Sequence, residues 1–430
     1  MKFTKGDKKI LNAWAFYDWA NSVYSLTIVS AVFPLFIGAY LEQLNIQKLV
    51  VFGSQITHTV LITYVTAFGF LVVAIFSPIL SGIADYKGNK KAFMRFFCYL
   101  GAFSCMLLYF FSVEHIYLSL LIYVLALIGF WGSLVFYNSY LPDIAYKEQQ
   151  DAISAKGFSM GYIGSVLLLV INLVMILSSP DENKLQMMRY SFILVGVWWF
   201  SFSHYTYKYL PNFTNDKKVT KDIVFSGFNE LKLVWKELKN QLQLKRYLGA
   251  FFVYSMAVQT VMLVAAFFGE NEIAWKNNGI DKTMGLIISI LIIQLIAILG
   301  AFLTAKLSAK IGNIKALILI NFIWAAICIF AYFVTTPNDF FITAAAVGLV
   351  MGGVQSLSRS TYAKLLPQTE DTTSYFSFYD VAEKIGIVIG MGIFASVEVI
   401  TGSMRSAILF LVVFFIIGLI LLSRVPKKIE

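Results

Sequence analysis

The chain has 430 residues, of which 59% are hydrophobic and only 13% are charged, and its net charge is +10. A soluble domain of this size carries about twice that charged fraction, so the composition excludes an ordinary soluble protein and indicates a bilayer as a second apolar solvent. The three cysteines (Cys98, Cys105 and Cys328) lie in apolar runs without metal-ligand spacing, and we interpret them as small core residues.

Apolar runs predict membrane-spanning helices along the whole chain. A spanning helix needs about 20 predominantly apolar residues. Eleven uncharged runs bounded by charged residues fit, namely Trp19–Leu41, Leu49–Ala84, Phe96–Val113, Ile116–Pro142, Gly157–Pro180, Tyr190–Tyr207, Tyr247–Gly269, Thr283–Ala305, Ala316–Asn338, Phe340–Ser358 and Ser406–Ser423. A twelfth, Thr373–Val397, holds three charged residues in its first half. We accept it because its remainder is apolar, and because without it the C-terminus would lie on the wrong side for the charges around it.

The basic residues predict the orientation of these spans. With the N-terminus in the cytoplasm, cytoplasmic segments hold 27 of the 34 Lys and Arg residues, the opposite side holds 6, and Lys384 lies inside a span. Cytoplasmic loops of membrane proteins contain an excess of Lys and Arg. We therefore expect an integral protein of a bacterial-type cytoplasmic membrane with both termini in the cytoplasm. The same asymmetry explains the net charge without nucleic-acid binding.

A long basic segment, residues 211–246, follows the sixth span and separates the first six spans from the last six. Within it, Phe228–Leu244 carries apolar residues at helical spacing, which predicts an interfacial helix whose apolar face holds Phe228, Leu231, Val234, Trp235 and Leu238. We therefore expect an N-terminal six-helix bundle at residues 1–210, a cytoplasmic linker at 211–246 and a C-terminal six-helix bundle at 247–430. Leu141-Pro142 and Leu366-Pro367, and Gly88-Asn89 and Gly312-Asn313, recur at offsets of 225 and 224, which favours an internal duplication.

A polar stripe marks the first span. Asp18, Asn21, Ser22 and Ser25 are spaced i, i+3, i+4 and i+7 and so share one helix face, which must contact protein or water rather than lipid. One interpretation is the lining of a transport cavity, with Asp18 as a proton or cation site. The other is that Asp18 lies near the cytoplasmic interface and ties helix ends together.

Three charged residues share the eleventh span. Asp380, Glu383 and Lys384 stand at i, i+3 and i+4, so Asp380 and Lys384 can form an ion pair that lowers the cost of placing both in the membrane. This is either a switchable pair that couples protonation to conformational change or a static pair at the cytoplasmic rim. We favour the first, because three ionisable groups in one span are expensive.

Further polar residues are candidates for the substrate cavity. Arg359 shares a face of the tenth span with Gln355, and its guanidinium could hold a substrate carboxylate through two hydrogen bonds. Alternatively, it is the first cytoplasmic cation after that helix and only anchors it. Tyr137 and Asn138 in the fourth span and Gln259 in the seventh are similar candidates.

The segment Gly82-Ile83-Ala84-Asp85-Tyr86-Lys87-Gly88-Asn89-Lys90-Lys91 resembles the signature loop between the second and third helices of major facilitators. Its glycines permit a tight turn, Asp85 can face the positive N-terminus of a neighbouring helix, and the lysines favour the anionic side of the membrane. The resemblance implies a gating role, in which the loop latches the two halves in the outward-facing state, for Gly82, Asp85, Gly88, Lys90 and Lys91. Ser81 and Asn89 depart from the Gly and Arg of the pattern. The alternative is an ordinary basic turn.

Several short sequence segments resemble the autophagy-related-22-like, or vacuole effluxer, branch of major facilitators, and they occur in the same order as in that branch. They are Tyr17–Ser22, Phe136–Ile144, Ile153–Phe158, Gly352–Ser360, and Tyr379-Asp380-Val381 with Lys384. The resemblance implies an all-α polytopic membrane protein of twelve helices in two six-helix bundles, acting as a monomer, with a cavity lined by helices one, four, seven and ten. Fungal members are linked to amino-acid efflux from the vacuole.

The sequence therefore predicts a transporter rather than an enzyme. It contains no metal-ligand cluster, nucleophile elbow, phosphate loop or ATP-binding motif, so we expect no cofactor. We expect secondary active transport of a small polar metabolite by alternating access, with amino acids and the efflux direction favoured only by the resemblance. Protons or another coupling ion would act through Asp18, Asp380 or Glu383, paired with Lys384. The alternatives are a polytopic membrane enzyme, a channel without coupled transport, or a purely partner-binding membrane protein.

Overall fold

The computed structural model describes residues 4–213, 232–237, 240–276 and 279–426, and helices dominate them. The long helices of the N-terminal half are α1 (Lys8–Val23), α2 (Val32–Gln43), α3 (His58–Lys87), α4 (Lys90–Leu107), α5 (Ile116–Ile144), α6 (Lys147–Leu177) and α7 (Lys184–Tyr209). Those of the C-terminal half are α9 (Leu242–Glu272), α10 (Lys282–Ile311), α11 (Asn313–Ala331), α12 (Pro337–Leu365), α13 (Thr372–Thr401) and α14 (Met404–Ser423). Short segments are the π-helix η1 (Tyr24–Ala31), the 3-10 helices η2 (Leu108–Phe110) and η3 (Asp181–Asn183), and the strands β1 (Leu49–Val51) and β2 (Ser54–Ile56).

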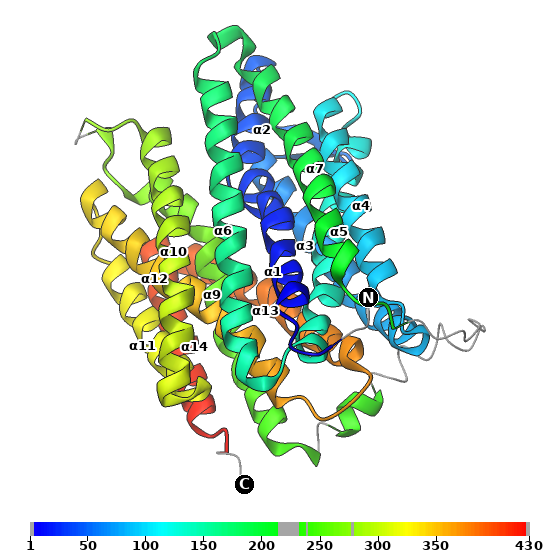
Figure 1. The fold of residues 1–430 in the computed structure, drawn as a ribbon. Coiled ribbons are helices and arrows are strands. Elements are labelled where there is room, and N and C mark those ends of the chain that lie inside the picture. The colour runs from blue at the N-terminus through cyan, green and yellow to red at the C-terminus, as the bar shows by residue number, and fades with distance from the viewer. Residues whose placement is uncertain (1–3, 214–231, 238–239, 277–278, 427–430) are drawn as a thin grey trace.

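The predicted twelve-helix fold is confirmed. In the described part of the chain, eleven helical segments are long and apolar enough to cross a membrane, and α1, η1 and α2 together form the first of them. The sixth predicted span is α7, a more polar helix of 26 residues that packs against α1 and α4. Figure 1 shows the N-terminal and C-terminal bundles side by side, with both chain termini toward the same end, which we call the terminal end.

The first span begins earlier than the prediction Trp19–Leu41. Its helix starts at Lys8, where the Asp7 side chain accepts a hydrogen bond from the backbone N–H of Lys9. The sequence prediction placed the boundary at the last charged residue, Asp18, but this residue is buried among protein groups, so the helix continues through it. In the same span the helical repeat widens into a π-segment at η1, a feature that often marks functional sites in helices.

The second span begins later than predicted. The uncharged run Leu49–Ala84 contains a β-hairpin before α3, in which β1 and β2 pair antiparallel. Phe52 and Gly53 form its turn with positive φ angles of 50° and 75°. Hydropathy alone could not separate this hairpin from the helix, because its β-branched residues are as apolar as those of a span.

The predicted linker helix lies only partly within the described residues. Phe228, Leu231 and Leu238 lie outside them. Residues 232–237 are helical: Val234 is buried, and the Trp235 ring lies 5.7 Å from that of Phe378 in α13. The carboxylate of Glu237 accepts a hydrogen bond from the Tyr375 hydroxyl. This part of the connection therefore packs against the C-terminal bundle.

Candidate functional site

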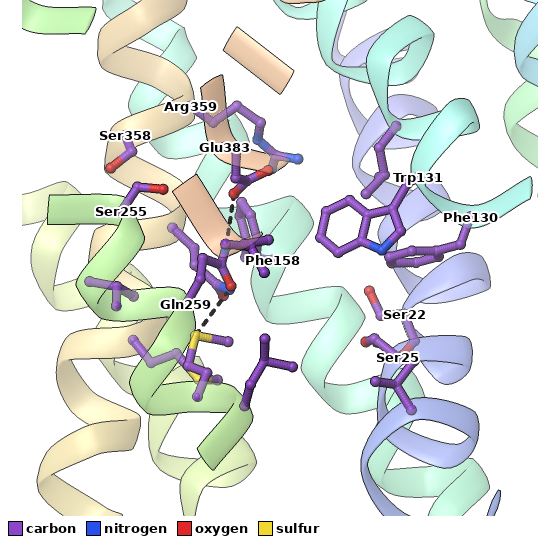
Figure 2. A pocket seen from close by; sticks show the side chains of 18 of the residues that line it. Ser22, Ser25, Phe130, Trp131, Phe158, Ser255, Gln259, Ser358, Arg359 and Glu383 are labelled. Atoms are coloured by element: carbon purple, nitrogen blue, oxygen red, sulfur yellow. Dashed lines mark hydrogen bonds between the residues drawn. The ribbon is translucent and has the colours of Figure 1, made fainter. Parts of the chain in front are cut away.

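A central cavity of about 250 Å³ lies between the two bundles. Its walls come from the first span and from α3, α5, α6, α9, α10, α12 and α13, and Figure 2 shows Ser22 and Ser25 facing Ser255, Gln259 and Glu383 across it. Its polar lining consists mainly of Asp18, Asn21, Ser22, Ser25, Asn138, Ser255, Gln259, Gln294, Gln355, Ser358, Arg359 and Glu383. Of the cavity candidates chosen from the sequence, Tyr137 alone is absent from the lining, and it contacts Asp18 from behind.

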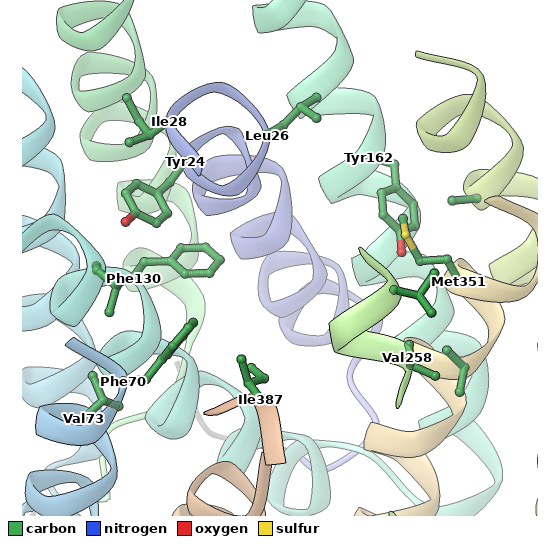
Figure 3. Packing of buried hydrophobic residues seen from close by; sticks show 14 of the residues in the cluster. Tyr24, Leu26, Ile28, Phe70, Val73, Phe130, Tyr162, Val258, Met351 and Ile387 are labelled. Atoms are coloured by element: carbon green, nitrogen blue, oxygen red, sulfur yellow. The ribbon is translucent and has the colours of Figure 1, made fainter. Parts of the chain in front are cut away.

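Apolar side chains complete the cavity walls. Figure 3 shows Phe70 and Phe130 of the N-terminal bundle on one side, and Val258 and Met351 of the C-terminal bundle on the other. Within the residues that the structure describes, no three His, Cys, Asp or Glu side chains are grouped as a metal site requires. The cavity lining therefore combines polar and apolar surfaces from both bundles.

A buried ion pair joins the bundles at the terminal end of this cavity. Arg359 of α12 lies 3.2 Å from the Oδ2 atom of Asp18 in α1, and both side chains are almost fully buried. The Tyr137 hydroxyl donates a 2.8 Å hydrogen bond to the same carboxylate oxygen. Neither sequence interpretation of Arg359 named this partner, which is 341 positions away in the chain.

The remaining donors of Arg359 also bind protein groups. Its Nε donates to the Ser154 hydroxyl at 2.9 Å, and its Nη2 donates to the Ser154 carbonyl at 3.0 Å. Its Nη1 reaches Asn138 Oδ1 at 3.3 Å, and the guanidinium lies 4.2 Å from the Phe158 ring centroid. Because these partners belong to the N-terminal bundle and Arg359 belongs to the C-terminal bundle, the contacts hold the bundles together in this conformation.

Gly157 of α6 makes this arrangement possible. A Cβ atom at this position would lie 2.5 Å from Asp18 Oδ2 and 3.0 Å from Arg359 Nη2. We expect Gly157→Ala to separate the pair and to lower the free energy of unfolding by about 1–3 kcal/mol, a usual cost of overpacking. Thermal unfolding in detergent measures this, with Gly392→Ala in α13 as the control because its Cβ would meet open space. Equal unfolding temperatures for the two variants would contradict the prediction.

A second charged group lies on α13. Lys384 Nζ is 2.5 Å from Asp380 Oδ1 and 2.9 Å from Glu383 Oε2, so two carboxylates share one ammonium group. Gln259 of α9 donates a 2.8 Å hydrogen bond to Glu383 Oε1. The ammonium group also lies 3.6 Å from the ring centroid of Trp131 in α5, in the opposite bundle. The group therefore contacts both bundles and the cavity.

The predicted gating loop forms the last turn of α3, a short turn and the first turn of α4, and it holds the bundles together at the terminal end. Asp85 accepts hydrogen bonds from the backbone N–H groups of Thr373 and Ser374, at 3.2 and 2.7 Å, in the first turn of α13. This is the contact with a positive helix N-terminus that the sequence led us to expect for Asp85. Lys90 pairs with Asp143 of α5 and donates to the Thr372 hydroxyl at 3.0 Å.

The other residues of this segment, Gly82, Gly88 and Lys91, lie within the N-terminal bundle. Gly82 is buried in α3, and Gly88 ends that helix with a left-handed φ of 62°, which a side chain would strain. Lys91 donates a 2.9 Å hydrogen bond to the Leu210 carbonyl after α7. The structure therefore brings Asp85 and Lys90 to α13, whereas Lys91 contacts its own bundle.

A related contact, not found from the sequence, lies on the other side of the terminal end. Asp151 of α6 accepts hydrogen bonds from Lys364 at 2.5 Å, Asn313 at 2.9 Å and Ser308 at 3.2 Å, all in the C-terminal bundle. Asn313 follows Gly312 in the dipeptide that repeats Gly88-Asn89. This repeat was the signal that could have pointed to Asp151, and the two contacts together join the bundles at the terminal end.

Asp371, the residue before α13, lies beside the Asp85 contact. Partial burial, with the neighbouring carboxylates Glu237 and Glu370, raises the pKa of Asp371 above its usual value. The folded state therefore favours the protonated carboxyl group, and this contribution to stability is lost as the pH rises through that pKa.

We expect Asp371→Asn to raise the unfolding temperature slightly at pH 7, with a smaller difference at pH 4. The control is Asp181→Asn, because the hydrogen bond and charge of Lys184 lower the pKa of the exposed Asp181. Asp181→Asn should leave the unfolding temperature at pH 7 unchanged or lower it. A carboxylate whose pKa is lowered in the folded state stabilises the fold only at pH values above that pKa. Thermal unfolding at the two pH values measures both, and a loss of stability in Asp371→Asn at pH 7 would refute the assignment.

Known proteins with similar sequences belong to one transporter family. The model of the family described as vacuole effluxer Atg22 like matches residues 6–428. The MFS-type transporter YxiO of Bacillus subtilis (strain 168) is 32% identical over 99% of this chain and 96% of its own length. Autophagy-related protein 22-2 of Aspergillus oryzae is 25% identical over 87% of this chain and 74% of its own length.

Solved transporter structures share the fold. A fucose:proton symporter of E. coli superposes with a TM-score of 0.68 and 17% identity over 98% of each chain. A proton:xylose symporter superposes with a TM-score of 0.73 and 12% identity, over 97% of this chain and 95% of that one. The chain therefore belongs to the vacuole effluxer Atg22-like family of major facilitator transporters, as the resemblance predicted.

Proposed function

We propose that this protein is a secondary active transporter that moves a small polar metabolite by alternating access. The observation that carries the proposal is the central cavity, whose walls come from both bundles and which ends at the buried pair of Asp18 and Arg359. A site built from both bundles can be exposed to either side of the membrane when the bundles rock. A channel or an enzyme would not require such a pair between two movable bodies.

In this proposal, residues 1–210 and 247–430 move as two bodies joined by residues 211–246. The cavity lining extends from Asp18 toward Ser30 and Thr66, away from the terminal end. If both termini are cytoplasmic, as the basic residues favour, this conformation is outward-facing. The opposite conformation requires the contacts of Asp85 and Asp151 to break. The protein acts as a monomer in a bacterial-type cytoplasmic membrane.

Proton coupling is supported by two sets of buried carboxylates beside the cavity. Protonation of Asp18 would remove its charge from Arg359 and weaken a tie between the bundles. Protonation of Asp380 or Glu383 would change how these carboxylates share Lys384. In this proposal, a proton binds these carboxylates with a different free energy in each of the two conformations. Coupling of proton movement to transport requires such a difference.

Efflux is the favoured direction because the family is described as vacuole effluxers, and amino acids are the favoured substrates only through the resemblance to the fungal members. The test is flux in proteoliposomes with and without a pH gradient, across amino acids and other small metabolites. Saturable uptake that shows counterflow would support a transporter over a channel. If Asp18→Asn and Asp380→Asn both leave the pH dependence of transport unchanged, proton coupling through these groups must be abandoned.

A further inference from the structure

The charges at the cavity do not balance. Among the described residues, the charged side chains that line the cavity are Asp18, Arg359 and Glu383, and the ion-pair cluster that contains Glu383 adds Lys384 and, behind it, Asp380. Arg359 pairs with Asp18, and Lys384 makes its shorter contact with Asp380. Three carboxylates thus face two cations, and one negative charge is left in excess.

Of the three charged residues in this ion-pair cluster on α13, Glu383 is the one whose carboxylate is exposed to the cavity. It belongs to the cavity lining, whereas the side chains of Asp380 and Lys384 lie behind it and are nearly inaccessible. The hydrogen bond from Gln259 orients the carboxylate from the neighbouring helix, and Figure 2 shows this contact at the cavity wall. An orienting hydrogen bond of this kind prepares a carboxylate for a ligand.

Two buried polar atoms on residues of the cavity lining lack hydrogen-bond partners in the described part of the chain. The hydroxyl of Ser255 is buried, has no hydrogen-bond partner among the described residues, and lies one helical turn before Gln259 on the same wall. Across the cavity, the Nδ2 atom of Asn21 is likewise buried without a partner among those residues. Buried polar atoms that lack partners are costly and usually mark a site where a ligand or water completes the hydrogen bonds.

Arg359 does not cancel the excess negative charge at the cavity, because its own charge is already paired with Asp18. It is the one cation in the cavity lining among the described residues, and its donors already bind Asp18, Ser154 and Asn138. A substrate carboxylate would have to displace these contacts and would also meet the excess negative charge. The apolar wall around Phe130 and Val258 can bury the body of an organic molecule.

We infer that the transported solute carries an ammonium group that binds the Glu383 carboxylate and an apolar part that packs between the two bundles. This assignment rests on the proposed transport function and names the substrate class of the same cavity. It places recognition on the amino group of the solute rather than on a carboxylate held by Arg359. An amine or an amino-acid amide then binds at least as well as the free amino acid, and the corresponding carboxylic acid does not bind.

The test uses three probes with one carbon skeleton: leucinamide as a cation, leucine as a zwitterion and 4-methylpentanoate as an anion. Calorimetry with the purified full-length protein should give binding of the cation and none of the anion. Glu383→Gln, which is isosteric and uncharged, should raise the Kd of leucinamide about 10- to 100-fold, the range expected for a hydrogen bond to a charged group. Glu383→Asp, which keeps the charge, should retain the preference for the cation.

Glu398→Gln is the matched control, because Glu398 lies on the same helix but outside the cavity lining. It should leave the Kd of leucinamide unchanged, and a common thermal unfolding temperature would show that the variants fold alike. Binding of the anion in preference to the cation, no binding of the cation, or an unchanged Kd in Glu383→Gln would each overturn the inference.

Flux in proteoliposomes separates this inference from the proposed function. Saturable transport of an anion or a neutral solute, with no effect of Glu383→Gln, would uphold the transporter and reject the cation site. Binding of leucinamide that depends on Glu383, without transport of any solute, would uphold the site and reject the proposed function.

Discussion

Replacing Arg359 with glutamine is expected to lower the free energy of unfolding by about 3–5 kcal/mol, because it leaves the Asp18 carboxylate buried without its cation. The double variant Asp18→Asn/Arg359→Gln should recover most of this loss, since it leaves no unpaired charge. Both variants should lose transport if the pair holds the bundles in one of the two working conformations. Thermal unfolding of the two single variants and the double variant, treated as a double-mutant cycle, measures the coupling.

The exposed pair of Lys282 and Glu270 provides the control. These side chains are 46% and 44% exposed and lie 2.9 Å apart. Lys282→Gln should therefore cost less than about 1 kcal/mol. If Arg359→Gln destabilised the protein no more than Lys282→Gln, or if the double variant were no more stable than Arg359→Gln alone, the pair could not have the role assigned to it.

Removing both carboxylates that close the terminal end is expected to shift the conformational equilibrium. Asp85 and Asp151 each accept three hydrogen bonds from the opposite bundle. Hydrogen bonds to charged groups are worth about 1.5–3 kcal/mol each, and part of this is regained from water when the contact opens. We therefore expect Asp85→Ala/Asp151→Ala to increase the population with an open terminal end about 10- to 100-fold.

Distances between spin labels at the terminal end measure this population. Glu148→Cys in α6 and Lys310→Cys in α10 place exposed labels on opposite bundles, and the native cysteines Cys98, Cys105 and Cys328 are all buried. The double variant should add a longer distance to the distribution. Asp7→Ala is the control, because Asp7 caps α1 within one bundle. A distribution unchanged from that of the wild type would show that these contacts do not hold the bundles together.

The class of fold follows from the amino-acid sequence alone. The uncharged runs and the unequal distribution of lysine and arginine are local properties, and the bilayer responds to them locally, so twelve spans can be counted along the chain without tertiary contacts. The ordered blocks of family resemblance also predicted the family that the comparisons establish. Asp85 could be placed at a helix N-terminus because its motif fixes a short turn, although the helix itself, α13, was not named.

The boundaries and the partners depended on tertiary structure. Hydropathy could not separate the hairpin before α3 from a span, and it ended the first span at Asp18 although the helix continues to Lys8. A charged residue inside a membrane is stable only with a partner. Which residue that is depends on how two bundles pack.

The pair of Asp18 and Arg359 shows this most clearly, because its members are 341 positions apart and no periodicity links them. Asp151 and its three partners were missed for the same reason. Within one helix, the spacing of Asp380 and Lys384 was enough to expect their ion pair, since i, i+4 neighbours must meet. Only the packing of α9 against α13 decided that Gln259 binds Glu383, because a contact between helices is fixed by packing rather than by spacing along the chain.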